Sequence, residues 1–263
     1  MISFTSAQLD AWIALFVFPL TRILGLLASA PVFNNAALPV RVRLIVGLAI
    51  ALAVAPALPP LPAIPASSWV GLAVMAQQIL IGVLLGFTLR ISFAAVDVAG
   101  ELIGLQMGLS FATFFDPGSG GQTPVVSEFL GLLTALVFLA LNGHLLTLTV
   151  LAESFTLLPV STAPIHVVAF ASLMVWAAIL FSTGLLLALP LITALLIANI
   201  ALGVLARIAQ QLNLFSVGFT VTLALGFLVL LVSLPYIGAA MEGLFTQGFA
   251  AMGAVMRAAR NPF

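Results

Sequence analysis

Cysteine and lysine are both absent from this chain of 263 residues. The lack of cysteine excludes disulfides, thiol nucleophiles and thiolate metal sites. Charge is also scarce, at 5% of the residues, whereas about one-quarter of a soluble domain is charged. Seven arginines balance seven acidic residues, and a net charge of zero argues against nucleic-acid binding. A chain of this composition cannot maintain a solvated surface.

Hydrophobic residues make up 63% of the chain, and the mean hydropathy is +1.34. Four long stretches contain no charged residue: 44–89, 129–152, 154–206 and 208–241. Each is longer than the roughly 20 residues that a helix needs to cross a bilayer. Prolines subdivide the longer stretches, because proline donates no backbone hydrogen bond. The sequence therefore predicts an all-α, multi-pass membrane protein that forms a single domain over residues 1–263.

We expect about six to eight hydrophobic helices, near residues 11–33, 41–56, 69–90, 91–110, 127–153, 166–189, 190–206 and 214–243. The first of them contains Ala28-Ser29-Ala30, which resembles a signal-peptide cleavage site. No basic residue precedes it and Pro31 follows it, so we interpret the segment as a retained helix.

Arginine positions indicate an orientation in the membrane. By the positive-inside rule, Arg41 and Arg43 lie in the cytoplasm, and Arg90 is the next cytoplasmic anchor, at the end of helix 69–90. Arg257 and Arg260 then place the C-terminal tail inside, whereas Arg207 does not fit simple alternation.

Several residues do not suit lipid-facing spans. Arg22 and Pro19 lie within the first apolar stretch, Pro190 interrupts a later one, and residues 90–128 hold five charged side chains. Hydrocarbon offers no water to a charge or to a freed backbone group. We therefore expect these helices to face protein or a water-filled path.

A polar face follows Arg90. Asp97 and Glu101 are seven and eleven residues further on, so all three share one helix face. Carboxylates one turn apart repel unless a cation or a hydrogen-bond donor compensates them. The pattern fits either a proton or cation site or polar contacts with a partner subunit.

Glycines recur at every fourth position on the same segment, at Gly100, Gly104 and Gly108. Small residues at this spacing let helices approach closely. Gly82 and Gly86 repeat the spacing, which predicts that helices 69–90 and 91–110 pack as a tight hairpin.

Methionine and phenylalanine then accumulate in residues 107–115, directly before the turn-forming residues 116–121. Such an apolar segment can pack in a core, or it can occlude a pore by excluding water and ions. Methionine is flexible enough to yield to a passing chain.

Residues for catalysis are few. His144 and His166 are the only histidines, and no cysteine or carboxylate stands at metal-ligand spacing around them. The Gly-rich residues 118–121 lack the lysine of a P-loop. We therefore expect no enzyme activity, no cofactor and no metal site.

Several stretches together resemble one family. They are Gln77-Gln78-Ile79-Leu80-Ile81-Gly82, residues 99–114, Asp116-Pro117, Asn142-Gly143-His144, Ala188-Leu189-Pro190-Leu191-Ile192-Thr193 and residues 207–213. The second, which runs from Ala-Gly-Glu-Leu-Ile-Gly to Ala-Thr-Phe, is long and specific, whereas Asn-Gly-His alone is weak. On these residues, the chain resembles the FliR family of the flagellar type III export gate over nearly its whole length.

The resemblance implies a non-enzymatic subunit of a protein-export channel in the bacterial inner membrane, at the flagellar basal body. FliP and FliQ would assemble with it, FlhB and FlhA would work beside it, and unfolded flagellar proteins would pass through. The implied fold consists of bent helical hairpins wound around a central pore, partly surrounded by membrane lipid.

The resemblance also implies a plug for the closed pore, at Gln106 to about Gln122, which favours gating over core packing. The predicted plug and gating residues are Gln106, Met107, Leu109, Ser110, Phe111, Phe114, Phe115, Asp116 and Pro117. We predict assembly or polar contacts at Arg90, Asp97, Gly100, Glu101, Gly104, Gly108, Asn142, His144 and Arg207. The chain departs from the family at Gln210, where proline is common.

Two other interpretations stay open. A proton- or cation-coupled secondary transporter would use Asp97 and Glu101 as ligands and Pro190 as the break in a discontinuous helix. However, the charged, glycine-rich segment has no second copy in the sequence. A membrane scaffold without a pore would stay tight to ions after the plug is changed.

Overall fold

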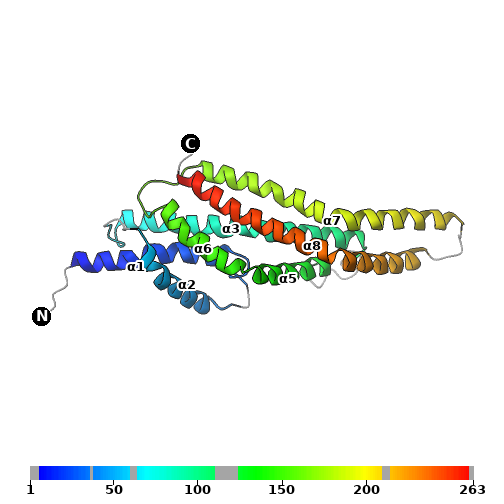
Figure 1. Ribbon diagram of the computed structural model, residues 1–263, viewed down its shortest axis with the longest axis horizontal. Coiled ribbons are helices and arrows are strands. Elements are labelled where there is room, and N and C mark those ends of the chain that lie inside the picture. Colours follow the sequence, from blue (N-terminus) through cyan, green and yellow to red (C-terminus); the bar gives the residue numbers. More distant parts are fainter. Residues whose placement is uncertain (1–5, 36–37, 60–63, 110–123, 209–213, 261–263) are drawn as a thin grey trace. The chain divides into compact units, whose positions relative to one another are not determined.

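Helices account for the regular structure of this chain wherever the computed structural model describes it, which is over residues 6–35, 38–59, 64–109, 124–208 and 214–260 (Figure 1). In chain order they are α1 (Ser6–Ser29), α2 (Val40–Val54), the short 3-10 helix η1 (Ala55–Ala57), α3 (Trp69–Gln106), α5 (Val125–Ala140), α6 (Gly143–Leu157), α7 (Val168–Ile208) and α8 (Leu214–Arg260). The prediction of an all-α membrane protein with six to eight helices is confirmed.

Four of these helices contain candidate membrane spans, at Trp12–Ser29, Trp69–Gln106, Val168–Ile208 and Gly218–Arg260. The consecutive helices α5 and α6 form a fifth candidate if the break between them lies within one span. Three of the four single helices are about twice as long as the roughly 20 residues that a bilayer requires.

Helix α3 corrects the prediction of two helices at 69–90 and 91–110. It continues without interruption from Trp69 to Gln106. The residues between Leu89 and Phe93 include neither glycine nor proline, so nothing in the chain favours a turn there. The predicted hairpin is therefore wrong, and Arg90 lies within a helix instead of anchoring a loop at its end.

Pro190 does not end a helix either. Helix α7 runs through it, and α8 likewise continues through Pro235. A proline removes only one helical hydrogen bond, and in apolar surroundings the rest of the backbone is best satisfied by remaining helical.

The predicted helix at 127–153 is instead two helices, because the chain turns at Asn142. This residue has a left-handed backbone conformation with φ 55° and ψ 29°. Asparagine adopts this conformation more readily than most residues with a side chain.

The chain divides into two compact units, each built from separate stretches. Unit 1 consists of Met1–Ile91, Asn142–Ala177 and Phe245–Phe263, and unit 2 consists of Ser92–Leu141 and Ala178–Leu244. Helices α3, α7 and α8 each contribute residues to both units. The prediction of a single domain stays a prediction.

Close approaches between helices form the core of unit 1, where α1 packs on α2 and on the first part of α3 (Figure 1). A Cβ atom added to Gly25 would lie 2.5 Å from the carbonyl oxygen of Ile79, and one on Gly82 would overlap the carbonyl oxygen of Arg22. Gly86 meets Ser29 in the same way. The glycines at 82 and 86 therefore mediate close packing, as their spacing predicts, but the partner is α1.

Unit 2 places the second part of α3 against two other helices, α5 and α7. Gly100 packs directly on the backbone of Ser127 in α5, and Gly184 of α7 lies against the carbonyl oxygen of Ala95. Phe93 and Phe138 make an edge-to-face contact with 5.5 Å between ring centroids. These contacts fix the end of α3, from which the predicted plug begins.

Candidate functional site

Arg22 is the centre of a buried polar cluster that joins three helices of unit 1. Its side chain is fully buried, and its Nε and one terminal nitrogen both donate to Oε1 of Gln78 in α3. The other terminal nitrogen donates to Oγ of Ser154 in α6 at 3.1 Å. The carbonyl oxygen of Leu158, at the end of α6, accepts a further hydrogen bond at 2.8 Å. Four bonds thus tie α1 to α3 and to α6.

The partners of Arg22 are neutral, so its charge is stabilised without a carboxylate at these bonds. The C-terminal end of a helix carries partial negative charge, and Arg22 lies at the C-cap of α6. The ring of Phe155 lies 4.1 Å from the guanidinium carbon, and a desolvated cation over an aromatic face contributes about 2 kcal/mol. The helix end and the ring together compensate a charge that would otherwise be costly in an apolar core.

Gln78 is only partly satisfied in this cluster. Its Oε1 faces the guanidinium and accepts two bonds, while its Nε2 is buried without a hydrogen-bond partner in the part of the chain that is described. Exchanging the two ends of the amide would direct N–H groups at a cation, so Arg22 determines the orientation of Gln78.

The sequence predicts that Arg22 faces protein or a water-filled path, and the structure confirms that it faces protein. That Arg22 and Gln78 form a site was not predicted. The available signal was that both are strongly polar residues within otherwise apolar helical segments. Their pairing is not visible in the sequence, because Gln78 and Ser154 lie 56 and 132 residues away.

Residues 106–109, where α3 ends, are the only part of the predicted plug segment within the described residues. Gly108 has φ 81° and donates from its N–H to Leu105, and Leu109 donates to Gly104. These bonds are those of a Schellman motif, which commonly ends a helix at a glycine. Gln106 and Leu109 are half-buried there. Ser110, Phe111, Phe114, Phe115, Asp116 and Pro117 lie outside the described residues, as does Gln210.

Met107 is fully buried in unit 2. A Cβ atom on Gly226 of α8 would lie 2.7 to 3.0 Å from the end of the Met107 side chain, so the two helices meet closely at this point. The start of the predicted plug segment is thus held by a helix cap and by a packed methionine.

Asp97 and Glu101 line a shallow groove of about 380 Å³ in unit 2, together with Glu128 of α5. All three carboxylates are exposed. Oγ of Ser127 donates to the backbone oxygen of Asp97 at 3.1 Å and so holds α5 against α3. Among the described residues, no group of three or more potential metal ligands converges on one point. The groove is acidic and accessible, and such a surface suits polar contacts.

The other predicted contact residues have varied environments. Gly104 is buried beside Val126, and a Cβ atom added to this glycine would lie 4.0 Å from that side chain, so Gly104 has more free space than Gly100. Arg90 and Arg207 are exposed. Asn142 is exposed at the turn before α6, and His144 is half-buried with no partner for Nδ1 in the described chain.

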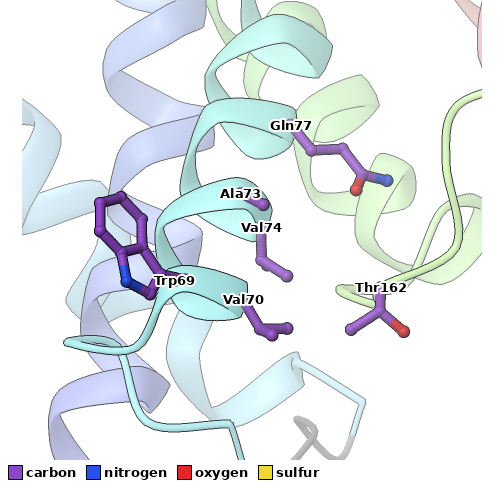
Figure 2. A pocket seen from close by; sticks show the side chains of 6 residues that line it. All are labelled: Trp69, Val70, Ala73, Val74, Gln77 and Thr162. Atoms are coloured by element: carbon purple, nitrogen blue, oxygen red, sulfur yellow. The ribbon is translucent and has the colours of Figure 1, made fainter.

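A second groove, of about 280 Å³, lies at the start of α3 in unit 1. Figure 2 shows Val70, Val74 and Gln77 along one side of the helix, with Thr162 across from them and the ring of Trp69 turned away. Nε2 of Gln77 donates to the carbonyl oxygen of Ala163 at 2.7 Å. Trp69 is 88% exposed at the start of a long apolar helix, a position typical of membrane–water interfaces.

Known proteins are similar to this chain along nearly its whole length. The family described as "Bacterial export proteins, family 1" matches residues 13–248. A protein named "Flagellar biosynthetic protein FliR" from Pectobacterium carotovorum subsp. carotovorum is 48% identical over 249 residues, which is 95% of each chain. The chain belongs to the FliR family of bacterial export proteins.

Other proteins with the same name are also similar to this chain. The one from Escherichia coli (strain K12) is 44% identical over 95% of each chain. The one from Aquifex aeolicus (strain VF5) is 33% identical over 92% of this chain and 93% of its own. The family match includes Arg22, Gln78 and the whole of α3, so it covers residues of both units. The chain is a membrane-embedded protein of flagellar biosynthesis.

Proposed function

We propose that this FliR-family chain is a subunit of the flagellar type III export gate in the bacterial inner membrane, at the basal body. It assembles with FliP and FliQ, beside FlhB and FlhA, and unfolded flagellar proteins pass through the resulting channel. The observation that carries this proposal is the end-to-end similarity to proteins named for flagellar biosynthesis. The chain's role is structural, and the export is driven by its partners.

The burial pattern supports an assembled subunit. In the most apolar segments of α7 and α8 only 17% of the residues are buried, compared with 61% in α3. Charged side chains also lie exposed on predominantly apolar helices, among them Glu101 and Glu128. Partner subunits would cover the apolar faces and provide hydrogen-bond donors for these carboxylates.

The gating part of the proposal assigns the plug to residues from Gln106 to about Gln122. Met107 is packed against Gly226 and the α3 end is capped at Gly108, so both anchor the base of the segment. The phenylalanines at 111, 114 and 115 then close the pore as a hydrophobic constriction.

A deletion strain complemented with a tagged copy of this chain tests the proposal. We expect loss of filaments and of motility, with normal nutrient uptake, and restoration by the tagged copy. FliP and FliQ should be recovered with the tagged chain from solubilised membranes. A chain that is stable, transports a solute by itself and recovers neither subunit would instead support the coupled transporter with Asp97 and Glu101 as ligands.

A further inference from the structure

One side chain joins the end of α3 to the middle of α8 in unit 2. Met107 is fully buried directly after the last residue of α3, and its N–H donates to the carbonyl oxygen of Ile103 at 2.9 Å. A Cβ atom added to Gly226 of α8 would lie 2.7 Å from Cγ, 2.8 Å from Cε and 3.0 Å from Sδ of Met107. These are the three nearest atoms, so the methionine fills the space that Gly226 leaves free. We name this the Met107 contact.

The Met107 contact differs in kind from the other close approach of α3 in unit 2. A Cβ atom on Gly100 would meet the backbone of Ser127, so α3 and α5 separate there only if a backbone moves. At Gly226 the neighbouring atoms are instead the end of an unbranched, flexible side chain. A change of rotamer can withdraw that side chain while both helices stay in place. The Met107 contact is therefore the more easily released of the two.

Release of the Met107 contact breaks no hydrogen bond of the helix end. The bonds that terminate α3 join backbone groups, from the N–H of Gly108 to Leu105 and from the N–H of Leu109 to Gly104. The contact itself joins a thioether side chain to a helical glycine. Its loss costs apolar packing but leaves no polar group unpaired, which is the larger penalty in a buried site.

Helix α8 is buried along one narrow stripe at this level. Thr222 and Leu230, one turn before and one turn after Gly226, are buried, whereas the adjacent Leu228 is 60% exposed. Met107 meets the centre of this stripe. Its position therefore fixes the end of α3 against α8.

We propose that the Met107 contact is a releasable contact of the export gate, which keeps the resting gate tight to ions and opens when an exported chain passes. This inference rests on the proposed function and gives α8 a part in gating through Gly226. The alternative is a permanent anchor, in which the methionine stays against Gly226 throughout export.

A disulfide across the contact distinguishes these two cases. The chain contains no cysteine, so Met107→Cys with Gly226→Cys introduces its only thiols. Cγ of Met107 lies 2.7 Å from the Cβ position of residue 226, and a carbon–carbon bond adds about 1.5 Å, so the two Cβ atoms are close enough for a disulfide. In a deletion strain that assembles its gate with this double variant, an oxidant should link the pair. Export of flagellar proteins should fall in proportion to the linked fraction and return after reduction.

The single-cysteine variants, treated in the same way, control for effects of the oxidant. Normal export with nearly all chains linked overturns the releasable contact and supports the permanent anchor. A pair that stays unlinked in an assembled gate overturns the contact itself. The proposed function fails separately, if the tagged wild-type chain recovers neither FliP nor FliQ from solubilised membranes.

A single added methyl group tests the contact without cysteines. Gly226→Ala should displace the Met107 side chain and raise the ion leakage of cells with an assembled gate. Gly238→Ala is the matched control on the same helix, because a Cβ atom there meets nothing within 4 Å. Recovery of FliP and FliQ with each variant measures gate abundance. Equal leakage of the two variants at equal abundance overturns the proposal, and if Gly226→Ala does not assemble, the disulfide decides.

Discussion

Arg22 shows how a single residue can hold three helices together. Its guanidinium donates to Gln78, Ser154 and Leu158, so each of α1, α3 and α6 depends on one buried side chain. A planar, five-donor cation suits this role, because it can bond Gln78 with two parallel N–H groups while reaching two other acceptors.

Replacement of Arg22 tests this directly. Arg22→Met should lower the free energy of unfolding in detergent by about 2–4 kcal/mol, since buried acceptors on Gln78 and Leu158 lose their donors. Arg22→Lys keeps the charge but not the fork, so an intermediate loss is expected. Arg90→Met is the control, because Arg90 is exposed. Equal stability of Arg22→Met and Arg90→Met would refute the stabilising role of the Arg22 hydrogen bonds.

Replacement of Gln78 should also change the stability of the chain. Gln78→Leu should cost about 3 kcal/mol, because two hydrogen bonds to a charged group are lost. Gln78→Glu should be at least as stable as the wild type, since a carboxylate accepts the same two bonds and removes the unpaired Nε2. Thermal unfolding of the purified chain measures both. A Gln78→Glu variant less stable than Gln78→Leu would contradict the assigned amide orientation.

Helix packing in unit 1 depends on glycines, and this predicts opposite effects for the same substitution at two sites. Gly25→Ala should destabilise by about 1–3 kcal/mol, because the added methyl group meets a backbone oxygen that cannot move aside. Gly238→Ala in α8 meets nothing within 4 Å, so it should be neutral or stabilise by up to about 1 kcal/mol. Unfolding midpoints of the two variants, measured side by side, provide the comparison. A loss at both sites would show that helix flexibility, not close packing, matters.

Helices were easier to predict from the sequence than their ends. The charge-free stretches identified the apolar helices, and glycine spacing identified the faces that pack closely. The breaks between helices were harder to predict. Pro190 and Pro235 remain inside helices, whereas Asn142, with its left-handed backbone, separates α5 from α6. Proline is a strong breaker in water, but in apolar surroundings unpaired backbone is worse than a local kink.

Partners of a given face could not be predicted, because they are set by long-range packing. The spacing of Gly82 and Gly86 indicated a close helix contact but not that α1 would make it. Arg22 was predicted to face protein or a water-filled path, whereas its bonds to α3 and α6 required the fold. The predicted plug residues from Ser110 to Pro117 stay predictions, since they lie outside the described residues.

The proposed plug has to be tested in the assembled gate and not in the isolated chain. Deletion of residues 110–120 should make cells that assemble the gate permeable to small ions, because the hydrophobic constriction is lost. Leakage is measured as loss of membrane potential, with the wild-type gate at equal abundance as control. Unchanged leakage in a fully assembled gate would count against the plug and favour a scaffold without a pore.

The order of segments in unit 1 has a consequence for synthesis on the ribosome. This unit contains the early helices α1 and α2 but is completed only by Phe245–Phe263, where Met252 and Met256 are buried and the carbonyl oxygen of Ala259 accepts from the N–H of His166. Unit 1 therefore cannot be complete until that late stretch has been translated. A premature stop just before Phe245 therefore leaves unit 1 without its last segment, even though its first helices have long been made.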